Sequence, residues 1–211
     1  MIEATLKDKS LVIDILSNSF DSNKSVNYII KQDSQRVNRI KALMSYSFDS
    51  CFMFGKVYLS DNRKACALIL FPDQKKFSLR AIWLDLSLVF KAIGINRAGK
   101  AMSRESQIKS NYPKQSFYYL WFLGVLDSEQ HKGTGTSLLE ELILDSQKQN
   151  REIYLETSTT KNIPWYSKFN FKIYKEIDFG YKLYMLKRDI THLPYESLPY
   201  RYGTNHTDLP D

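Results

Sequence analysis

Residues 117–144, FYYLWFLGVLDSEQHKGTGTSLLEELIL, decide the fold of this chain. The opening part, 117–126, is aromatic and aliphatic throughout, which is typical of a buried strand. Apolar residues then recur at helical spacing, which predicts an amphipathic helix; they are Leu138, Leu139, Leu142 and Ile143. The turn between strand and helix, 130–136, therefore gathers unpaired N–H groups at the positive end of a helix dipole. Such a helix start predicts an anion site, most often for phosphate.

The glycines of this turn, Gly133 and Gly135, allow the backbone to approach a ligand with no Cβ in the way. The turn is no Walker A loop, because Lys132 precedes the glycine and no Gly-Lys-Ser/Thr comes after it. It is no dinucleotide fingerprint either, since the place of the third glycine holds Leu138. A Gly-x-Gly before a helix is weak evidence alone, so the interpretation depends on a second motif nearer the C-terminus.

Two motifs in order resemble the GNAT superfamily of N-acetyltransferases. The signature Gln/Arg-x-x-Gly-x-Gly/Ala is matched by QHKGTG at 130–135, shortly after a strand that contains LGV at 123–125. A second match lies in LETS at 155–158 and NIPWYSKFNF at 162–171. It is similar to the segment Leu-Glu-Thr-Ser, Asn-x-Pro-Phe-Tyr-Glu-Arg-x-Gly-Phe, particularly in the puromycin N-acetyltransferase-like branch. The resemblance covers 117–188, about a third of the chain.

The resemblance implies both a fold and an activity. The fold is the α/β (α+β) GNAT acyl-CoA N-acyltransferase fold, with a central mixed sheet of about six to seven strands flanked by helices. The activity is transfer of an acetyl group from acetyl-CoA to a primary amine of a small molecule, by direct attack through a tetrahedral intermediate. Two alternatives stay open: acetylation of a protein amine, and a non-catalytic acyl-CoA-binding or nucleic-acid-associated module. The acceptor is not encoded in the motifs, because loops and insertions determine it.

The resemblance also assigns site residues. Tyr166 is the implied general acid, with a buried tyrosine in an aromatic cluster as the alternative. For the general base we favour Glu156 over Tyr119, with a hydrogen-bonded strand carboxylate as the alternative. Asn162 is expected either to bind the cofactor or to cap the next helix. The expected contacts to acetyl-CoA are Leu123, Gly124, Val125, Gln130, His131, Lys132, Gly133, Thr134, Gly135, Thr136 and Asn162.

The chain is long enough for one enlarged domain, expected at 1–188, with a helical insertion at about 77–114 and a C-terminal extension at 189–211. Asn170 replaces the motif glycine and is expected to be left-handed. A helix at 34–54 is expected to bury a stripe that begins at Val37. The other helices are expected at 11–20, 78–93, 97–112 and 163–169, and the other strands at 56–60, 64–71, 152–157, 171–178 and 181–188.

The insertion carries most of the positive charge. Residues 91–114 hold six Lys and Arg against Glu105 alone, in a chain of formal net charge +7. Such a run forms either a solvated helix face or a basic lid over the acceptor pocket that attracts an anionic cofactor. A nucleic-acid partner is disfavoured, since no RNA-binding or helix-turn-helix signature is visible.

Composition also bears on the location of the protein, on a membrane partner and on a metal site. Only Cys51 and Cys66 occur, which suits a reducing cytosol. The start shows no secretory signal, and no apolar run approaches the roughly 20 residues that span a bilayer. We therefore expect a cytoplasmic protein without a membrane partner. The histidines, at 131, 192 and 206, are too scattered to predict a metal site.

Overall fold

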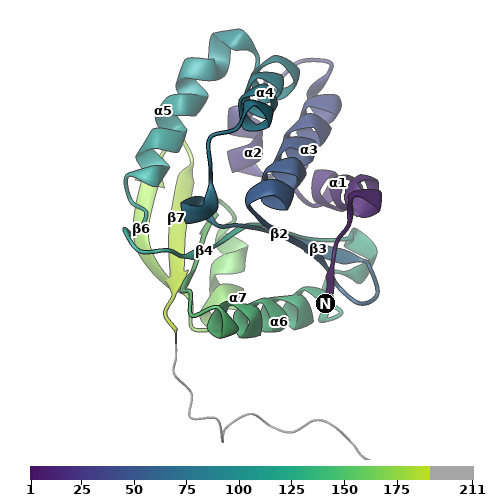
Figure 1. Ribbon diagram of the computed structural model, residues 1–211, viewed down its shortest axis with the longest axis vertical. Helices are drawn as coiled ribbons and strands as arrows, with labels where there is room; N and C mark the ends of the chain where they lie inside the picture. The colour runs from purple at the N-terminus through teal and green to yellow at the C-terminus, as the bar shows by residue number, and fades with distance from the viewer. Residues whose placement is uncertain (191–211) are drawn as a thin grey trace, which may run out of the picture.

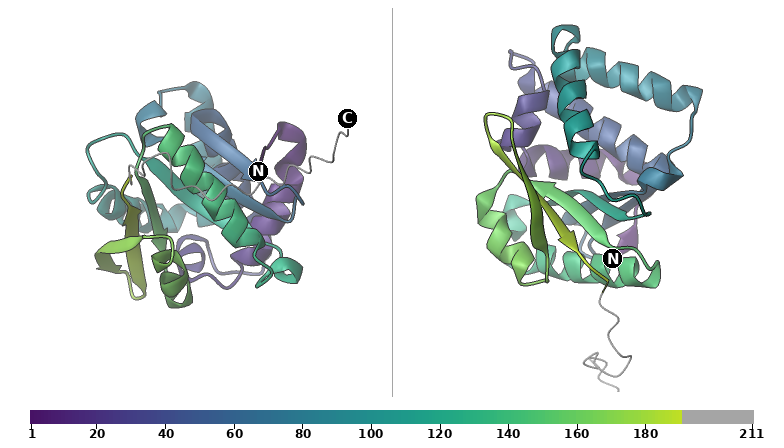
Figure 2. Two further views of the ribbon diagram at one scale, coloured as in Figure 1. Left: turned by 90° about the horizontal axis from the view of Figure 1, so that it is seen from below. Right: turned by 90° about the vertical axis from the view of Figure 1, so that its left-hand side faces the viewer.

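The computed structural model describes residues 1–190, which form a seven-stranded mixed sheet between two helical layers (Figure 1). The strand order is β1-β2-β3-β4-β5-β7-β6. Helices α1 to α5 lie on one side of the sheet, and α6 and α7 lie on the other (Figures 1 and 2). The strands are β1 (Ile2–Glu3), β2 (Gly55–Leu59), β3 (Ala65–Leu70), β4 (Tyr118–Val125), β5 (Ile153–Thr157), β6 (Lys172–Asp178) and β7 (Lys182–Arg188). The helices are α1 (Lys9–Ser19), α2 (Lys24–Ile29), α3 (Arg36–Phe54), α4 (Leu79–Leu88), α5 (Ala98–Lys109), α6 (Thr134–Lys148) and α7 (Ile163–Ser167).

This architecture confirms the fold class and the expected elements, with local differences. Asn170 is left-handed, at φ 62°, as predicted. Neither β1 nor α2 was expected, because both are too short to show a period in the sequence. The expectation for Val37 is wrong: it lies in the first turn of α3 and is 57% exposed. The expected tail lies mostly outside the described residues, in 191–211.

The central feature of the sheet is the divergence of β4 from β5. These parallel strands pair only at Tyr118 with Ile153 and at Tyr119 with Tyr154. Beyond this point β4 continues beside β3 and β5 continues beside β7. The second half of β4 therefore has a strand neighbour on one side only. On the other side the Val125 carbonyl accepts from Ser19 Oγ at 2.9 Å, and the remaining main-chain groups form an open edge.

A bulge lies where the strands part. Leu68 of β3 faces Phe122, and the next residue, Ile69, faces Leu120, so Trp121 is the extra residue in β4. Trp121 and Phe122 consequently pack on the same side, against the core beneath α1 and α3. A bulge of this kind redirects the main chain of the strand locally.

Helix α6 is fixed to the sheet by apolar contact and by one carboxylate. The four apolar residues predicted to face the core are all buried, with Leu138, Leu139 and Leu142 fully so. At the other end of α6, Asp145 Oδ2 accepts from the hydroxyls of Tyr58 at 3.1 Å and Tyr118 at 3.0 Å. These bonds tie the helix to β2 and β4, so the start of α6 has a defined position beside β4.

We expect Gly55→Ala and Gly99→Ala to change stability in opposite directions. A Cβ at Gly55 would lie 2.0 Å from the carbonyl oxygen of Ile69 in β3, so the change should force β2 and β3 apart. Its cost should be about 2–3 kcal/mol. Gly99 lies in α5 with no atom within 4 Å of the new methyl group, so alanine should stabilise by about 0.5–1 kcal/mol. Urea unfolding measures both, and a wild-type midpoint for Gly55→Ala would contradict this packing.

Candidate active site

The turn before α6 has the conformation that its glycines permit. Gly133 is left-handed, at φ 86°, and so is His131, at φ 62°. Gly135 serves a different purpose, because a Cβ there would lie 3.1 Å from Val125 Cγ2. Of the two glycines, one therefore bends the chain and the other lets α6 approach β4 closely. Our expectation that both glycines also make room for a ligand stays a prediction.

The first turn of α6 presents free main-chain donors. The N–H of Ser137 already donates to the Gly133 carbonyl, at 2.9 Å. Within residues 1–190, the N–H groups of Thr134, Gly135 and Thr136 have no acceptor. Together with the dipole of a fifteen-residue helix, these donors can bind an anion.

The side chains of the turn stabilise the turn itself. Gln130 Nε2 donates to Asp127 Oδ1 at 2.8 Å. Lys132 Nζ lies 3.6 Å from Glu129, which also accepts from Lys64 at 3.0 Å. The Lys64 ammonium lowers the pKa of Glu129, which keeps this carboxylate ionised. Main-chain groups, rather than these side chains, are therefore the part of the turn left available to a ligand.

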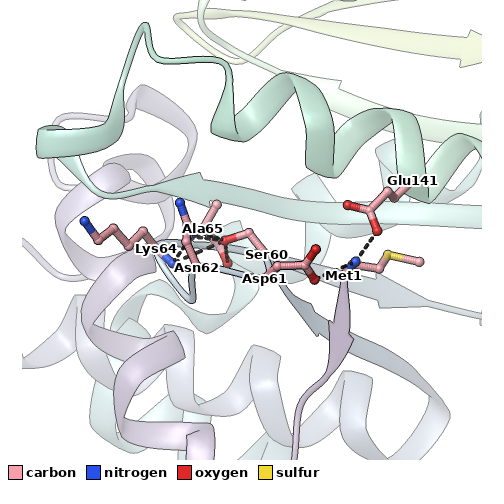
Figure 3. A network of polar contacts seen from close by, with 7 residues as sticks. All are labelled: Met1, Ser60, Asp61, Asn62, Lys64, Ala65 and Glu141. Atoms are coloured by element: carbon pink, nitrogen blue, oxygen red, sulfur yellow. Dashed lines mark hydrogen bonds and ion pairs between the residues drawn. The ribbon is translucent and has the colours of Figure 1, made fainter. Parts of the chain in front are cut away.

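A shallow pocket of about 280 Å³ lies between this turn and the β2–β3 connection. Two carboxylates line it, Asp61 and Glu141, and both are ion-paired with the amine of Met1 (Figure 3). The nearby connection is closed by Ser60 and Asn62, which bond each other and the main chain of 64–65 (Figure 3). The Met1 amine and Lys132 offset these two carboxylates, so the pocket has no net positive charge to attract a phosphate, and we expect an anion on the other side of the turn, toward the open edge of β4.

One hydrogen bond connects α7 to the start of α6. Trp165 Nε1 donates to Thr136 Oγ1 at 3.2 Å. The next residue, Tyr166, is buried, with its ring centroid 4.8 Å from that of Trp165 and 5.4 Å from that of Phe171. Its hydroxyl makes no hydrogen bond within the described chain, and burial raises its pKa. The structure thus contains the aromatic cluster of the alternative interpretation, and also a protonated hydroxyl that is not engaged elsewhere.

Glu156 lies on the opposite face of the sheet. It accepts a hydrogen bond from the hydroxyl of Tyr119, and Tyr112 lies within hydrogen-bonding reach of both. Burial raises the pKa of Glu156 to about 7; the Tyr119 bond opposes this shift, and the Glu105 carboxylate adds to it. A carboxylate that titrates near neutral pH is well matched to accept a proton at physiological pH.

Sequence reasoning missed the contribution of the insertion to this region. Arg104 in α5 is only 7% exposed, so a solvated face is wrong for this residue. Its guanidinium donates to Ser25 Oγ of α2 at 2.5 Å and to the Tyr181 hydroxyl at 2.9 Å. Ser25 in turn donates its N–H to Ser158, directly after β5, at 3.3 Å. The one available signal was helical spacing, which puts Arg104 on the same face as the buried Ile108.

Other predicted residues are less engaged. Asn162 precedes α7, but its side chain makes no capping hydrogen bond, so the capping alternative is wrong. His131 and Lys132 are exposed, which leaves their interaction with phosphate a prediction. Among residues 1–190, no three His, Cys, Asp or Glu side chains are arranged to hold a metal ion. In the same part of the chain, no helix is both long and apolar enough to cross a bilayer.

Comparison with known proteins identifies the fold. No known family profile matches the sequence. A structure of histone acetyltransferase HPA2 and related acetyltransferase from Corynebacterium glutamicum is 18% identical, with a TM-score of 0.67 over 92% of this chain and 97% of that one. The arylalkylamine N-acetyltransferase 2 of Aedes aegypti is 14% identical, with a TM-score of 0.59 over 90% of this chain and 98% of that one. The condensation domain of Ebony, in complex with beta-alanyl-dopamine, is 11% identical, with a TM-score of 0.63 over 90% and 97%. The chain therefore has the fold of the GNAT acetyltransferases.

The raised pKa of Glu156 predicts a pH-dependent stability. Because the folded chain holds this proton up to about pH 7 and the unfolded chain releases it near 4.5, the contribution of Glu156 to stability is fully present below 4.5 and is lost as pH rises through 7. Glu156→Gln keeps an acceptor for Tyr119 and removes the titration. Between pH 5 and 8 the wild type should lose about 2–3 kcal/mol relative to this variant in urea unfolding.

The matched control is Glu140→Gln, exposed on α6, which should match the wild-type pH profile. If the stability of the wild type and of Glu156→Gln depended on pH in the same way, burial would not raise the pKa of the Glu156 carboxyl.

Proposed function

We propose that this protein transfers the acetyl group of acetyl-CoA to the primary amine of a small molecule. The proposal is supported chiefly by one observation: the open edge of β4 leads directly to the free N–H groups at the start of α6. The extended edge of β4 can pair with a long amide-bearing arm, and the anion site at the start of α6, in line with that edge, can bind a diphosphate. Coenzyme A is such a ligand, and none of the proposed steps needs a metal.

The proposed contacts divide between main chain and side chain. The diphosphate binds the N–H groups of 134–136, flanked by His131 and Lys132. The pantetheine arm pairs with the edge of β4 along 123–125, as a peptide does in strand addition. Gln130 and Gly133 shape the turn, and Asn162 is free to reach the cofactor because its side chain caps no helix.

In the proposed chemistry, one proton transfer takes place on each face of the sheet. The amine nitrogen attacks the thioester carbon, and a main-chain N–H near the bulge stabilises the oxyanion. The tetrahedral intermediate then expels the thiolate, which takes its proton from Tyr166. The proton lost by the amine passes to Glu156, directly or through water. Tyr166 and Glu156 fit these roles because they lie on opposite faces of the sheet, with the diverging strands between them.

A small acceptor is favoured over a protein amine by the position of the insertion. Arg104 fixes α5 against α2 and the β6–β7 turn, so the insertion does not stand clear of the acceptor side. The ring of Tyr28 in α2 also packs on Phe179 and Tyr181 of that turn, at 5.9 Å and 5.3 Å. This closed arrangement restricts the acceptor in size. The puromycin N-acetyltransferase-like branch and the cytoplasmic location stay predictions from sequence alone.

Coenzyme A binding and amine-dependent thiol release test the proposed function. By calorimetry, the wild type should bind coenzyme A, and Gly133→Val should weaken binding at least about tenfold, because a β-branched residue resists φ 86°. Gly180→Val is the matched control, with the same type of strain at φ 81° in the β6–β7 turn, and should keep the wild-type affinity.

Acetyl-CoA with a broad panel of amines and amine-bearing peptides should then release free thiol with small amines above all. Coenzyme A binding without release from any amine would establish the non-catalytic module instead. Release with peptides alone would establish the protein acetyltransferase.

Tyr166→Phe should separate chemistry from binding. If the hydroxyl protonates the leaving thiolate, kcat should fall by roughly 10²–10³-fold while the affinity for coenzyme A stays within about twofold. Tyr154→Phe is the matched control, because it removes the hydroxyl of another buried tyrosine, one that donates to Glu152 at 2.9 Å, and should leave kcat nearly unchanged. Equal kcat in Tyr166→Phe and the wild type would remove Tyr166 as the acid.

A further inference from the structure

The outer face of α4 is apolar and uncovered. Six large side chains there are between 40% and 86% exposed, and we call them the α4 face; they are Phe77, Leu79, Ile82, Trp83, Leu86 and Phe90. From Leu79 onward their spacing is i, i+3, i+4, i+7 and i+11, which forms a single stripe along the helix. Leu84 and Leu88 lie on the side of α4 toward α3, and Trp83, at the edge of the stripe, also borders the pocket between these two helices.

Such a concentration is unusual for a protein surface. The described residues expose 14 large hydrophobic side chains in all, and six of them fall between residues 77 and 90. Single exposed apolar residues are ordinary, but a contiguous group marks a surface that binds something.

The rim of the α4 face is basic. Residues 75–91 contain four Lys and Arg and a single acid, Asp85. Asp85 accepts from the hydroxyl of Tyr46 in α3 at 2.7 Å, so it is already engaged. Within residues 1–190, none of Lys75, Lys76 and Arg80 forms an ion pair, and Lys91 lies over the ring of Trp83 at 5.9 Å. The stripe is therefore bordered by positive charge without nearby compensation.

We propose that the α4 face docks this protein on an anionic lipid surface. An aromatic and aliphatic stripe with Lys and Arg at its border is the composition of helices that lie in the plane of a membrane interface. The apolar side chains would enter the boundary between headgroups and acyl chains, and the basic rim would bind lipid phosphates. A second copy is a poorer occupant, because it would bring two basic rims together. This proposal departs from our sequence-based expectation of no membrane partner, which stays a prediction.

The α4 face lies away from the turn at 130–136, where the proposed cofactor site is. Figures 1 and 2 show α4 at the end of the molecule far from α6 and α7, whereas α5 runs from that end toward the sheet. The turn at 130–136 would consequently stay open to water while α4 lies on the membrane. The docking proposal does not depend on the proposed acetyltransferase activity.

Vesicle sedimentation with the full chain tests the proposal. The protein should pellet with phosphatidylcholine vesicles that contain about 30% phosphatidylserine, far less with phosphatidylcholine alone, and less again as salt is raised. The double variant Leu86→Gln/Phe90→Gln should weaken partitioning at least about tenfold. Leu144→Gln, an exposed leucine of α6, is the matched control and should pellet as the wild type does.

A second variant tests the charge separately. Lys75→Gln/Lys76→Gln/Arg80→Gln keeps the stripe and should lose roughly tenfold or more of the binding to anionic vesicles. All these positions are exposed, so thermal melting should match the wild type. Failure to pellet with any vesicle would overturn the proposal. A wild-type dimer in sedimentation velocity, with a monomeric Leu86→Gln/Phe90→Gln variant, would also overturn it, since a second copy would then cover the α4 face.

Discussion

The separation of β4 from β5 after two residue pairs is the constraint on which the rest of this structure depends. Each strand has a full partner on its outer side, β3 for β4 and β7 for β5, so neither can move toward the other without losing a ladder. The Trp121 bulge marks the point of departure. Main-chain donors and acceptors left open along a strand must be satisfied by water or by a ligand, and here they lie in line with a helix start that has the same need.

Burial acts on the two proposed catalytic groups in the same direction with different chemical results. It raises the pKa of Tyr166, which keeps a phenol protonated and able to donate. It also raises the pKa of Glu156, which brings a carboxylate to the pH range where it exchanges protons readily. One physical cause, removal of charge from water, thus supports an acid on one face of the sheet and a base on the other.

The parts of the fold that the sequence predicts are those set by local pattern. Strand alternation predicts that Glu156 and Leu155 lie on opposite faces of the sheet, and helical spacing predicts that Leu138 and Leu142 are buried. The features that it misses depend on contacts between distant segments: Tyr119 and Glu156 are 37 residues apart, and Arg104 and Ser25 are 79 apart. A bulge leaves no trace in a run that is apolar at every position.

The insertion starts after β3 and ends before β4, and these two strands are direct antiparallel neighbours. Its two ends therefore meet at a fixed separation that the sheet alone determines, and its length places no strain on the strands. Evolution can exchange, lengthen or remodel α4 and α5 as a cassette while β3 and β4 keep their register. The proposed acceptor side and the proposed lipid contact, both on this insertion, can therefore change without altering the proposed cofactor site at the start of α6.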